Sequence, residues 1–232
     1  MRFAIGGIRK TSLLDYPDKI SAIVFTQGCN FNCGYCHNPQ LLNSKSEKDI
    51  YNVDVFFDFL RKRIGKLDGV VITGGEATLQ PDLKSFIKEI KSMKFLVKLD
   101  TNGYKPEVIE DLLSENLVDY IAMDVKGPLY KYSSITKKEI DTNKIKDSIN
   151  LILNSKIDYE FRTTLLPILI SIQDFYEIGK LISSAKKYYL QRFIVQSEIN
   201  DKSLTNEQNY TDKEFEAIIN ILNNYVDFVA VR

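Results

Sequence analysis

The chain has 232 residues, 44% of them hydrophobic and 27% charged, which is long and apolar enough for one globular domain with a continuous buried core. Its 31 Lys and Arg residues balance 31 Asp and Glu residues, so no overall basic field would gather nucleic acid, and we expect no nucleic-acid partner. No apolar stretch is long enough to cross a bilayer, and the first residues lack an apolar signal core, so we expect a cytoplasmic protein without a membrane partner.

Apolar runs rich in Val, Ile and Phe alternate along the chain with segments of helical period. In chain order, the predicted strands are Ile20–Thr26, Gly69–Thr73, Leu96–Asp100, Tyr120–Asp124, Tyr159–Thr163, Phe193–Gln196 and Val226–Val231. The predicted helices are Val53–Arg63, Leu83–Met93, Glu107–Glu115, Lys144–Asn154, Phe175–Lys187 and Lys213–Asn224, with plausible starts at Pro81-Asp82, Lys105-Pro106 and Thr211-Asp212. About six β-α units are fewer than a closed eightfold barrel needs, so the pattern predicts an open, partial (β/α)6 barrel with a parallel sheet and outer helices.

Two polar stretches, Ser133–Asn143 and Asn200–Asn209, are predicted to be surface loops. Shorter polar strings follow the predicted strands at their carboxyl ends. These strings are Thr26–Cys29, Thr73–Glu76, Asp100–Gly103, Asp124–Lys126, Arg162–Thr164 and Gln196–Glu198. Because the carboxyl ends of parallel strands meet at one edge of a sheet, we expect these residues to form a single site.

The three cysteines, Cys29, Cys33 and Cys36, fall within eight residues, and the only histidine, His37, is next to them. Without an export signal they should be reduced thiols, and an odd number cannot all pair within one molecule. Thiolates are the usual protein ligands of iron-sulfur clusters, and three of them leave one iron of a cubane open to a small chelating molecule. The spacing therefore favours an open 4Fe-4S cluster.

Two other metal sites fit part of this pattern. A closed Cys3His zinc site would make the chain a zinc-binding interaction module, although the adjacent Cys36 and His37 would have difficulty reaching one ion together. The string from Cys33 to His37 also matches the c-type haem attachment pattern, which normally implies export.

The string Cys-x-x-x-Cys-x-Tyr-Cys, from Cys29 to Cys36, resembles the signature of the radical S-adenosylmethionine (SAM) superfamily. Further strings along the chain resemble the activating proteins of anaerobic ribonucleoside-triphosphate reductase, which are glycyl-radical enzyme activases. These strings are Asp15–Pro17, Gly28–Asn30, Tyr35–Pro39, Thr73–Glu76, Lys98–Gly103, Val118–Lys126 and Phe161–Thr164. The resemblance implies a single radical SAM domain over residues 1–232, with an N-terminal extension (1–19) and a partial barrel (20–232).

The resemblance also implies roles for individual residues. It assigns Cys29, Cys33 and Cys36 to the cluster, and it assigns no catalytic residue beyond the cluster and the SAM site. For SAM it implies Gly74, Gly75 and Glu76 at the methionyl amino group, Asp124 and Lys126 near the carboxylate, Tyr35 and His37 along the adenine, Asp100, Thr101 and Asn102 on the ribose side, and Arg162 and Gln196 elsewhere in the site.

Some of these assignments have simpler alternatives. Asp124 with Lys126, and Arg162 with a nearby carboxylate, could be ordinary ion pairs at strand ends, and we favour a supporting role for His37. The chain also departs from the family at two positions: Ala77 stands where proline is usual, and Asp18 where glycine is common.

The function implied by the resemblance is reductive cleavage of SAM to a 5′-deoxyadenosyl radical, which then generates a glycyl radical on the glycyl-radical subunit of the anaerobic reductase. The electron would come from a donor such as flavodoxin or ferredoxin. One alternative is activation of another glycyl-radical enzyme. A second is chemistry on a small pterin-like molecule, as in 7-carboxy-7-deazaguanine synthase. The absence of further cysteines excludes auxiliary clusters and a catalytic thiol.

Overall fold

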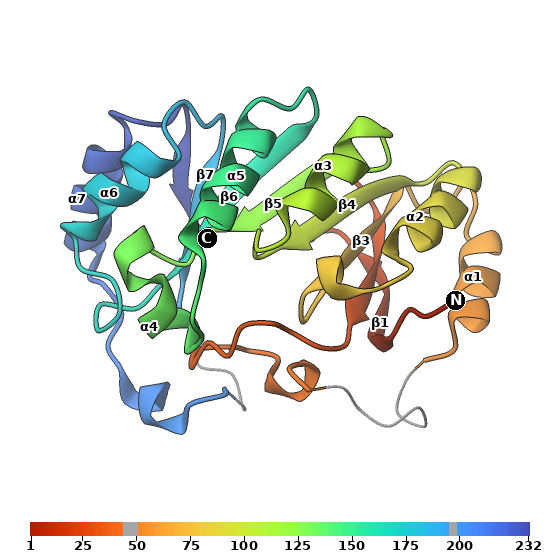
Figure 1. Cartoon of the computed structure of the whole chain (residues 1–232), viewed down its shortest axis with the longest axis horizontal. Coiled ribbons are helices and arrows are strands. Elements are labelled where there is room, and N and C mark those ends of the chain that lie inside the picture. The colour runs from red at the N-terminus through yellow and green to blue at the C-terminus, as the bar shows by residue number, and fades with distance from the viewer. Residues whose placement is uncertain (44–50, 195–198) are drawn as a thin grey trace. The chain divides into compact units, whose positions relative to one another are not determined.

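The computed structural model describes residues 1–43, 51–194 and 199–232 (Figure 1). Within these ranges the strands are β1 (Ile5–Ser12), β2 (Ser21–Thr26), β3 (Gly69–Gly74), β4 (Leu96–Thr101), β5 (Tyr120–Asp124), β6 (Asp158–Leu165), β7 (Tyr188–Arg192) and β8 (Val229–Val231). They follow one another in the sheet in chain order. β1 pairs antiparallel with β2, whereas β2 with β3, β3 with β4, β6 with β7 and β7 with β8 are parallel. The predicted open, mostly parallel sheet with helices is confirmed.

The helices lie between the strands, as the sequence pattern predicts. They are α1 (Val53–Arg61), α2 (Leu83–Ser92), α3 (Pro106–Ser114), α4 (Tyr132–Thr136), α5 (Thr142–Leu153), α6 (Asp174–Leu181) and α7 (Asp212–Leu222). Short 3-10 helices are η1 (Pro39–Leu41), η3 (Ala77–Leu79), η4 (Leu129–Lys131) and η5 (Lys202–Asn206). None of the helices in the described part of the chain is long and apolar enough to span a membrane.

The chain divides into two compact units. The first unit contains Met1–Asn30, Gln40–Thr101 and Glu107–Ile121, and the second contains Phe31–Pro39, Asn102–Pro106 and Ala122–Arg232. The single domain over residues 1–232 stays a prediction, and each unit is described separately below.

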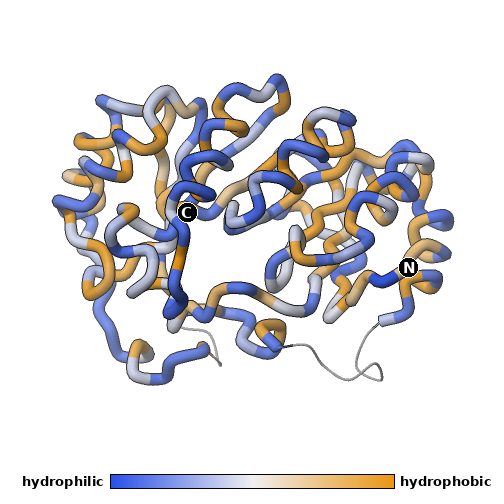
Figure 2. The backbone as a smooth tube through the Cα atoms, in the orientation of Figure 1, coloured by the Kyte–Doolittle hydropathy of each residue, from blue (hydrophilic) through white to orange (hydrophobic). Residues whose placement is uncertain are grey.

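The core of the first unit is built on strands β2 to β4. In β3, Val70, Val71 and Ile72 are at most 1% exposed, as expected for a parallel strand covered on both faces. Helices α1 and α2 alternate between apolar and polar residues along the tube of Figure 2, and their apolar sides meet in an aromatic cluster. The Phe86 ring lies 5.7 Å from the Phe56 ring and 3.8 Å from the Phe3 ring. This cluster holds the N-terminal segment on the same core.

The second unit is built on strands β6 to β8, with α6 and α7 side by side (Figure 1). A side chain at Gly179 in α6 would come within 2.4 Å of the Tyr225 ring, so glycine allows the close approach of the chain after α7. Helix α7 begins with a capping box, in which Thr211 and Glu214 each bond the backbone N–H of the other. The predicted start at Thr211-Asp212 is therefore confirmed.

Some predicted elements are wrong in position. The strand predicted at Phe193–Gln196 is instead β7, at Tyr188–Arg192, where Tyr188 and Leu190 alternate into the core. Phe193 and Ile194 follow the end of this strand, and 195–198 lie outside the described residues. Strand β1 occupies part of the predicted N-terminal extension. Helix α4 overlaps the predicted loop Ser133–Asn143, and the 3-10 helix η5 lies within the predicted loop Asn200–Asn209.

The two departures from the resembled family lie at local turns. Asp18, where glycine is common, has a φ of 58°, in the left-handed region that glycine adopts without a steric penalty. Ala77, where proline is usual, is the first residue of η3, a position that proline also accepts.

Candidate cofactor site

The cysteines are all free thiols within the described residues. Cys29 belongs to the first unit, and its backbone N–H donates to the Leu42 carbonyl at 3.2 Å. Cys33 and Cys36 belong to the second unit, in a segment that we call the cysteine loop (Asn32–His37). The Cys36 N–H donates to the Cys33 carbonyl at 3.2 Å, which closes a tight turn between these two ligand candidates.

His37 holds the end of the cysteine loop in the second unit. Its Nε2 lies 2.9 Å from the carbonyl oxygen of Ile194, and its ring centroid lies 5.5 Å from that of Phe193. Because a carbonyl oxygen only accepts, Nε2 carries the proton in this contact. The geometry gives His37 a supporting role in positioning the loop, and its contact with adenine stays a prediction.

Gly74 and Gly75 pack directly against the backbone that leads to Cys29. Gly74 has a φ of 118°, and a side chain at Gly75 would come within 2.1 Å of the Gly28 carbonyl oxygen. The Gly75 N–H donates to the Thr26 carbonyl at 2.9 Å, and the Glu76 N–H donates to the Gly28 carbonyl at 2.8 Å. Only glycine fits at these two positions, because backbone meets backbone there.

Glu76 is 1% exposed, and its carboxylate is fixed by hydroxyl and amide donors. Its Oε1 accepts from Thr78 N at 3.0 Å, from Thr78 Oγ1 at 2.6 Å and from Thr101 Oγ1 at 2.7 Å. Thr101, predicted on the ribose side of SAM, thus acts on Glu76 in this structure. A carboxylate held in this way has a fixed direction in which to accept further hydrogen bonds.

Asp100 and Asn102 each have a partner close by. In the first unit, Asp100 pairs with the ammonium of Lys98, which is only 2% exposed and lies 5.8 Å from the centroid of the Tyr120 ring. In the second unit, Asn102 Oδ1 accepts from Tyr104 N at 3.0 Å in a local turn. Both contacts stabilise the strand end, and the predicted contacts of these residues with ribose stay predictions.

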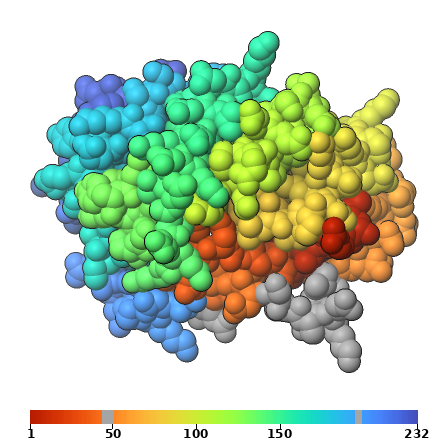
Figure 3. Space-filling view, in the orientation of Figure 1, coloured from red at the N-terminus to blue at the C-terminus, as the bar shows by residue number. Residues whose placement is uncertain are grey.

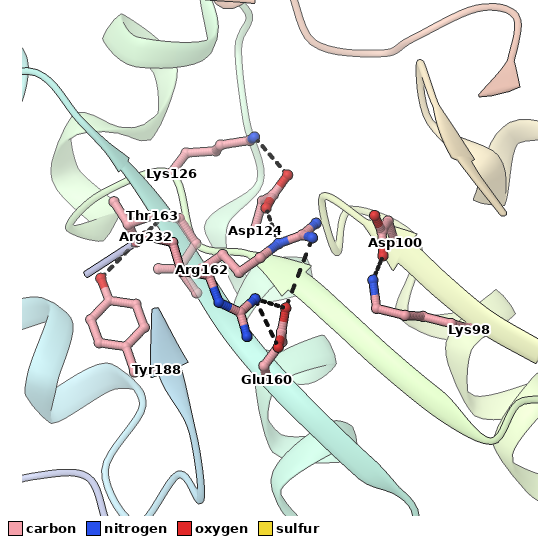
Figure 4. A network of polar contacts seen from close by, with 10 residues as sticks. Lys98, Asp100, Asp124, Lys126, Glu160, Arg162, Thr163, Tyr188 and Arg232 are labelled. Atoms are coloured by element: carbon pink, nitrogen blue, oxygen red, sulfur yellow. Dashed lines mark hydrogen bonds and ion pairs between the residues drawn. The ribbon is translucent and has the colours of Figure 1, made fainter. Parts of the chain in front are cut away.

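Asp124, Lys126 and Arg162 come together in the second unit (Figure 4). Asp124 Oδ1 lies 3.0 Å from Arg162 Nε, and Oδ2 lies 3.1 Å from Lys126 Nζ. Burial raises the pKa of the Asp124 carboxyl, but the Arg162 and Lys126 charges outweigh this effect and lower the pKa to about 2. Asp124 is therefore an anion at neutral pH, with one cation on each oxygen.

Lys126 also faces the cysteine loop. Its Nζ lies 5.9 Å from the centroid of the Tyr35 ring, near the outer limit of a cation–π contact. Burial lowers the pKa of Lys126, but Asp124 more than offsets this effect and holds the pKa well above its usual value. Burial raises the pKa of Cys33 and of Tyr35, and the Lys126 charge opposes both shifts. The positive charge of Lys126 therefore favours the thiolate form of Cys33.

Sequence reasoning missed Glu160 and Arg232. Glu160 is 1% exposed, and its carboxylate oxygens lie 3.2 and 3.4 Å from Arg232 Nη1, while Arg162 Nη1 lies 4.0 Å away (Figure 4). The sequence does contain one signal for this pair, since Glu160 is a carboxylate inside the apolar run of a predicted strand. A charge buried there requires a partner of opposite charge. The side chains of residues 160 and 162 share one face of β6.

A pocket of about 740 Å³ in the first unit opens beside Cys29. Its walls include the N-terminal segment, which Figure 3 shows in red at the surface beside the yellow segment of the same unit. Gln80 holds this wall, since its side chain donates to the Gln27 carbonyl and accepts from Ala4 N, both at 2.8 Å. The N-terminal segment, which the sequence did not connect with the site, thus lies next to a predicted ligand.

The donor set fits an iron-sulfur cluster in its chemistry. Three reduced thiols with three and two intervening residues are present, and a lysine charge offsets negative charge at Cys33. In the described ranges, no ready-made group of three or more His, Cys, Asp or Glu side chains surrounds a metal position. Gln196, predicted at the SAM site, lies outside the described residues.

A model of the radical SAM superfamily matches residues 23–182 of the chain. The chain is 34% identical to a Methanocaldococcus jannaschii protein named for the glycyl-radical enzyme activating enzymes, over all of this chain and 97% of that protein. It is 34% identical to the pyruvate formate-lyase-activating enzyme of Clostridium pasteurianum, over 53% of this chain and 52% of that enzyme.

Among solved structures, QueE from Escherichia coli shares the fold with a TM-score of 0.58 at 13% identity, over 99% of this chain and 93% of that chain. The match to the superfamily covers more than half of the residues, and the similarity to the Methanocaldococcus jannaschii protein spans the whole chain. The chain therefore belongs to the radical SAM superfamily, among the glycyl-radical enzyme activating enzymes, and is an enzyme that uses a 4Fe-4S cluster and SAM.

Proposed function

We propose that this enzyme generates a glycyl radical on the glycyl-radical subunit of an anaerobic ribonucleoside-triphosphate reductase. The observation that carries the proposal is the 34% identity, over the full chain, to a protein named as an activating enzyme of glycyl-radical enzymes. The choice of the reductase as target is supported by the resemblance of the strings Tyr35–Pro39 and Lys98–Gly103 to its activating proteins.

Cys29, Cys33 and Cys36 are proposed as the three cluster ligands. When bound, the cluster supplies the electron that cleaves SAM into methionine and a 5′-deoxyadenosyl radical. The chain's own contribution is to hold the thiols and place positive charge beside them. Lys126 serves the second purpose, since its ammonium is fixed by Asp124 at 3.1 Å and faces Tyr35. An external donor such as flavodoxin or ferredoxin is proposed to deliver the electron.

The SAM site is proposed to use one carboxylate for the amino group and one cation for the carboxylate. Glu76, held by Thr78 and Thr101, has the charge and the fixed orientation to accept hydrogen bonds from an ammonium group. Lys126, with its raised pKa, has the charge to pair with a carboxylate. Tyr35, His37, Asp100, Asn102, Arg162 and Gln196 are proposed to complete the site.

The first test concerns SAM cleavage. The protein is reconstituted anaerobically with iron and sulfide and reduced, SAM is added, and 5′-deoxyadenosine is quantified alongside a Cys33→Ala control. We expect product from the wild type and none from the variant. No product from a loaded, reduced wild type, with or without the reductase, would contradict the proposal.

The second test concerns the partner. The reduced, SAM-loaded enzyme is mixed with the cognate reductase, and the glycyl radical is measured by electron paramagnetic resonance. A control reductase has the target glycine replaced by alanine. A radical signal only on other glycyl-radical enzymes would assign a different partner, and turnover of a small pterin-like molecule without any protein radical would favour the small-molecule alternative.

A further inference from the structure

A segment far along the chain lies against the cysteine loop within the second unit. The backbone N–H of Asn200 donates to the Cys36 carbonyl at 3.3 Å, and the N–H of Asp201 donates to the Gly34 carbonyl at 2.8 Å. Two successive amides thus bond the loop that carries two of the proposed cluster ligands.

The side chain of Asn200 adds to these backbone bonds. Its Nδ2 lies 2.9 Å from Asn32 Oδ1, 3.1 Å from the Cys33 carbonyl oxygen and 3.4 Å from the Asn32 carbonyl oxygen. Because an amide nitrogen has two hydrogens, these three acceptors share them. Asn200 and Asp201 together donate to the carbonyls of residues 32, 33, 34 and 36.

Gly34 allows the two segments to approach this closely. A Cβ at residue 34 would lie 3.0 Å from Asp201 Cβ and 3.0 Å from Leu204 Cδ1, tighter than ordinary contact. Asp201 is itself held in place, because its Oδ1 accepts from Ser203 N at 3.0 Å and from Ser203 Oγ at 2.7 Å. The contact is therefore made between two locally ordered segments.

This contact matters chemically because carbonyl oxygens carry partial negative charge and a cluster with thiolate ligands is anionic. Hydrogen bonds and local charge around a cluster set its reduction potential. An amide donor that occupies the Cys33 carbonyl offsets that negative charge, and it also restricts the backbone that directs the thiol. Both effects act at Cys33, whose carbonyl also accepts the Cys36 N–H in the turn between the two cysteines.

We propose that Asn200 is a positioning residue of the cofactor site, which holds the cysteine loop through the carbonyls of Asn32 and Cys33 so that Cys33 and Cys36 are fixed for the cluster. The cluster role rests on the proposed function. The ordering of the loop does not, because it is a property of the polypeptide itself. The two parts can therefore be tested separately.

The first measurement uses the full chain without iron. Alkylation of each cysteine by iodoacetamide is followed by peptide mass spectrometry in the wild type, Asn200→Ala, Asn200→Asp and the control Asn206→Ala, an exposed asparagine of the same segment. We expect Cys33, 7% exposed, to react about fivefold faster in both Asn200 variants, as a loop does after losing one net hydrogen bond. Cys29, in the first unit, serves as the internal standard and should keep its rate.

The second measurement uses the reconstituted protein. We expect Asn200→Ala to lose its visible cluster absorbance to a chelator about fivefold faster than the control variant. We also expect a more negative reduction potential, with Asn200→Asp lower still because it adds an anion. The proposal would be overturned if folded Asn200→Ala and Asn200→Asp kept the wild-type rate of Cys33 alkylation, rate of cluster loss and reduction potential. If the wild type takes up no cluster, the proposed function fails, and the alkylation rates alone decide whether Asn200 holds the loop.

Discussion

Arg232 places its Nη1 3.2 and 3.4 Å from the two carboxylate oxygens of Glu160, a side chain only 1% exposed. The pair lies beside Arg162, which in turn bonds Asp124. Charges of alternating sign therefore run from Arg232, which directly follows β8, through β6 to the end of β5 (Figure 4). Such a row stabilises the unit only while every buried charge keeps its partner.

The variant Arg232→Met tests this pair. It keeps an apolar side chain over Tyr189 but removes both contacts of Arg232 Nη1 with the Glu160 carboxylate, from which Arg162 Nη1 lies farther away, at 4.0 Å. We expect the free energy of unfolding to fall by about 2–3 kcal/mol in urea titrations. The control Lys180→Met breaks an exposed pair with Glu177 and should cost less than about 1 kcal/mol. Equal effects of the two variants would contradict this prediction.

The lowered pKa of Asp124 predicts a pH dependence of stability. A carboxyl with a folded-state pKa below its unfolded value stabilises the protein above the unfolded value, near 4, and the contribution is lost as the pH falls towards about 2. The shift corresponds to about 2 kcal/mol. We therefore expect the wild type to lose about this much more stability than Asp124→Asn between pH 5 and pH 2 in urea unfolding of the apoprotein. Parallel curves for the two proteins would argue against a charged, paired Asp124.

Thr101 should influence SAM through Glu76. The variant Thr101→Val keeps the shape of the side chain but removes the hydroxyl that lies 2.7 Å from Glu76 Oε1. We expect the dissociation constant for SAM, measured by equilibrium dialysis, to rise about five- to tenfold. Thr101→Ser restores the hydroxyl and should return the constant close to the wild-type value. An unchanged constant in Thr101→Val would show that this hydrogen bond does not orient the carboxylate for SAM.

Gly75→Ala is expected to distort the backbone before Cys29, since its Cβ would lie 2.1 Å from the Gly28 carbonyl oxygen. Backbone on both sides leaves no flexible atom to move, so we expect a loss of about 3 kcal/mol or more in thermal unfolding. Gly65→Ala is the matched control, because its φ of 75° is strained but no atom lies within 4 Å of the added Cβ. It should cost about 1 kcal/mol, so a similar loss in both variants would contradict the predicted clash.

Local periodicity predicted most of the fold. Buried runs such as Val70–Ile72 and helix starts such as Thr211 and Pro106 have local signals that the structure bears out. Strand β1 was missed because its polar residues and Gly6-Gly7 resemble a turn, and its order comes from antiparallel pairing with β2. The Tyr188–Arg192 strand was displaced in the prediction because Phe193 and Ile194 extend the apolar run beyond the last paired residue.

The site was predictable where its residues follow one another in sequence. The cysteines and the string Gly74–Glu76 have spacings that are typical of a cluster site and a SAM site. The hydrogen bond from Thr101 to Glu76, in contrast, depends on how β3 and β4 are paired. No local sequence pattern marks Asn200, because the carbonyl groups to which its side chain donates lie 167 and 168 positions earlier in the chain. Contacts between residues so far apart in sequence depend on how the chain folds, and the helix and strand periodicity of the sequence does not predict them.

The long sequence separation between the cysteine loop and Asn200 also affects the order in which parts of the site can form while the protein is synthesised. The backbone around Cys29 is completed by Gly75 and Glu76, fewer than about 50 residues later, so this part becomes ordered while the ribosome is still making the first strands and helices. The hydrogen bonds that hold the turn at Cys33 and Cys36 can form only after Asn200 and Asp201 have emerged from the ribosome exit tunnel. Iron and sulfide supplied earlier would meet a loop whose carbonyls are still hydrated, so cluster insertion should belong to the nearly finished polypeptide rather than to the nascent chain.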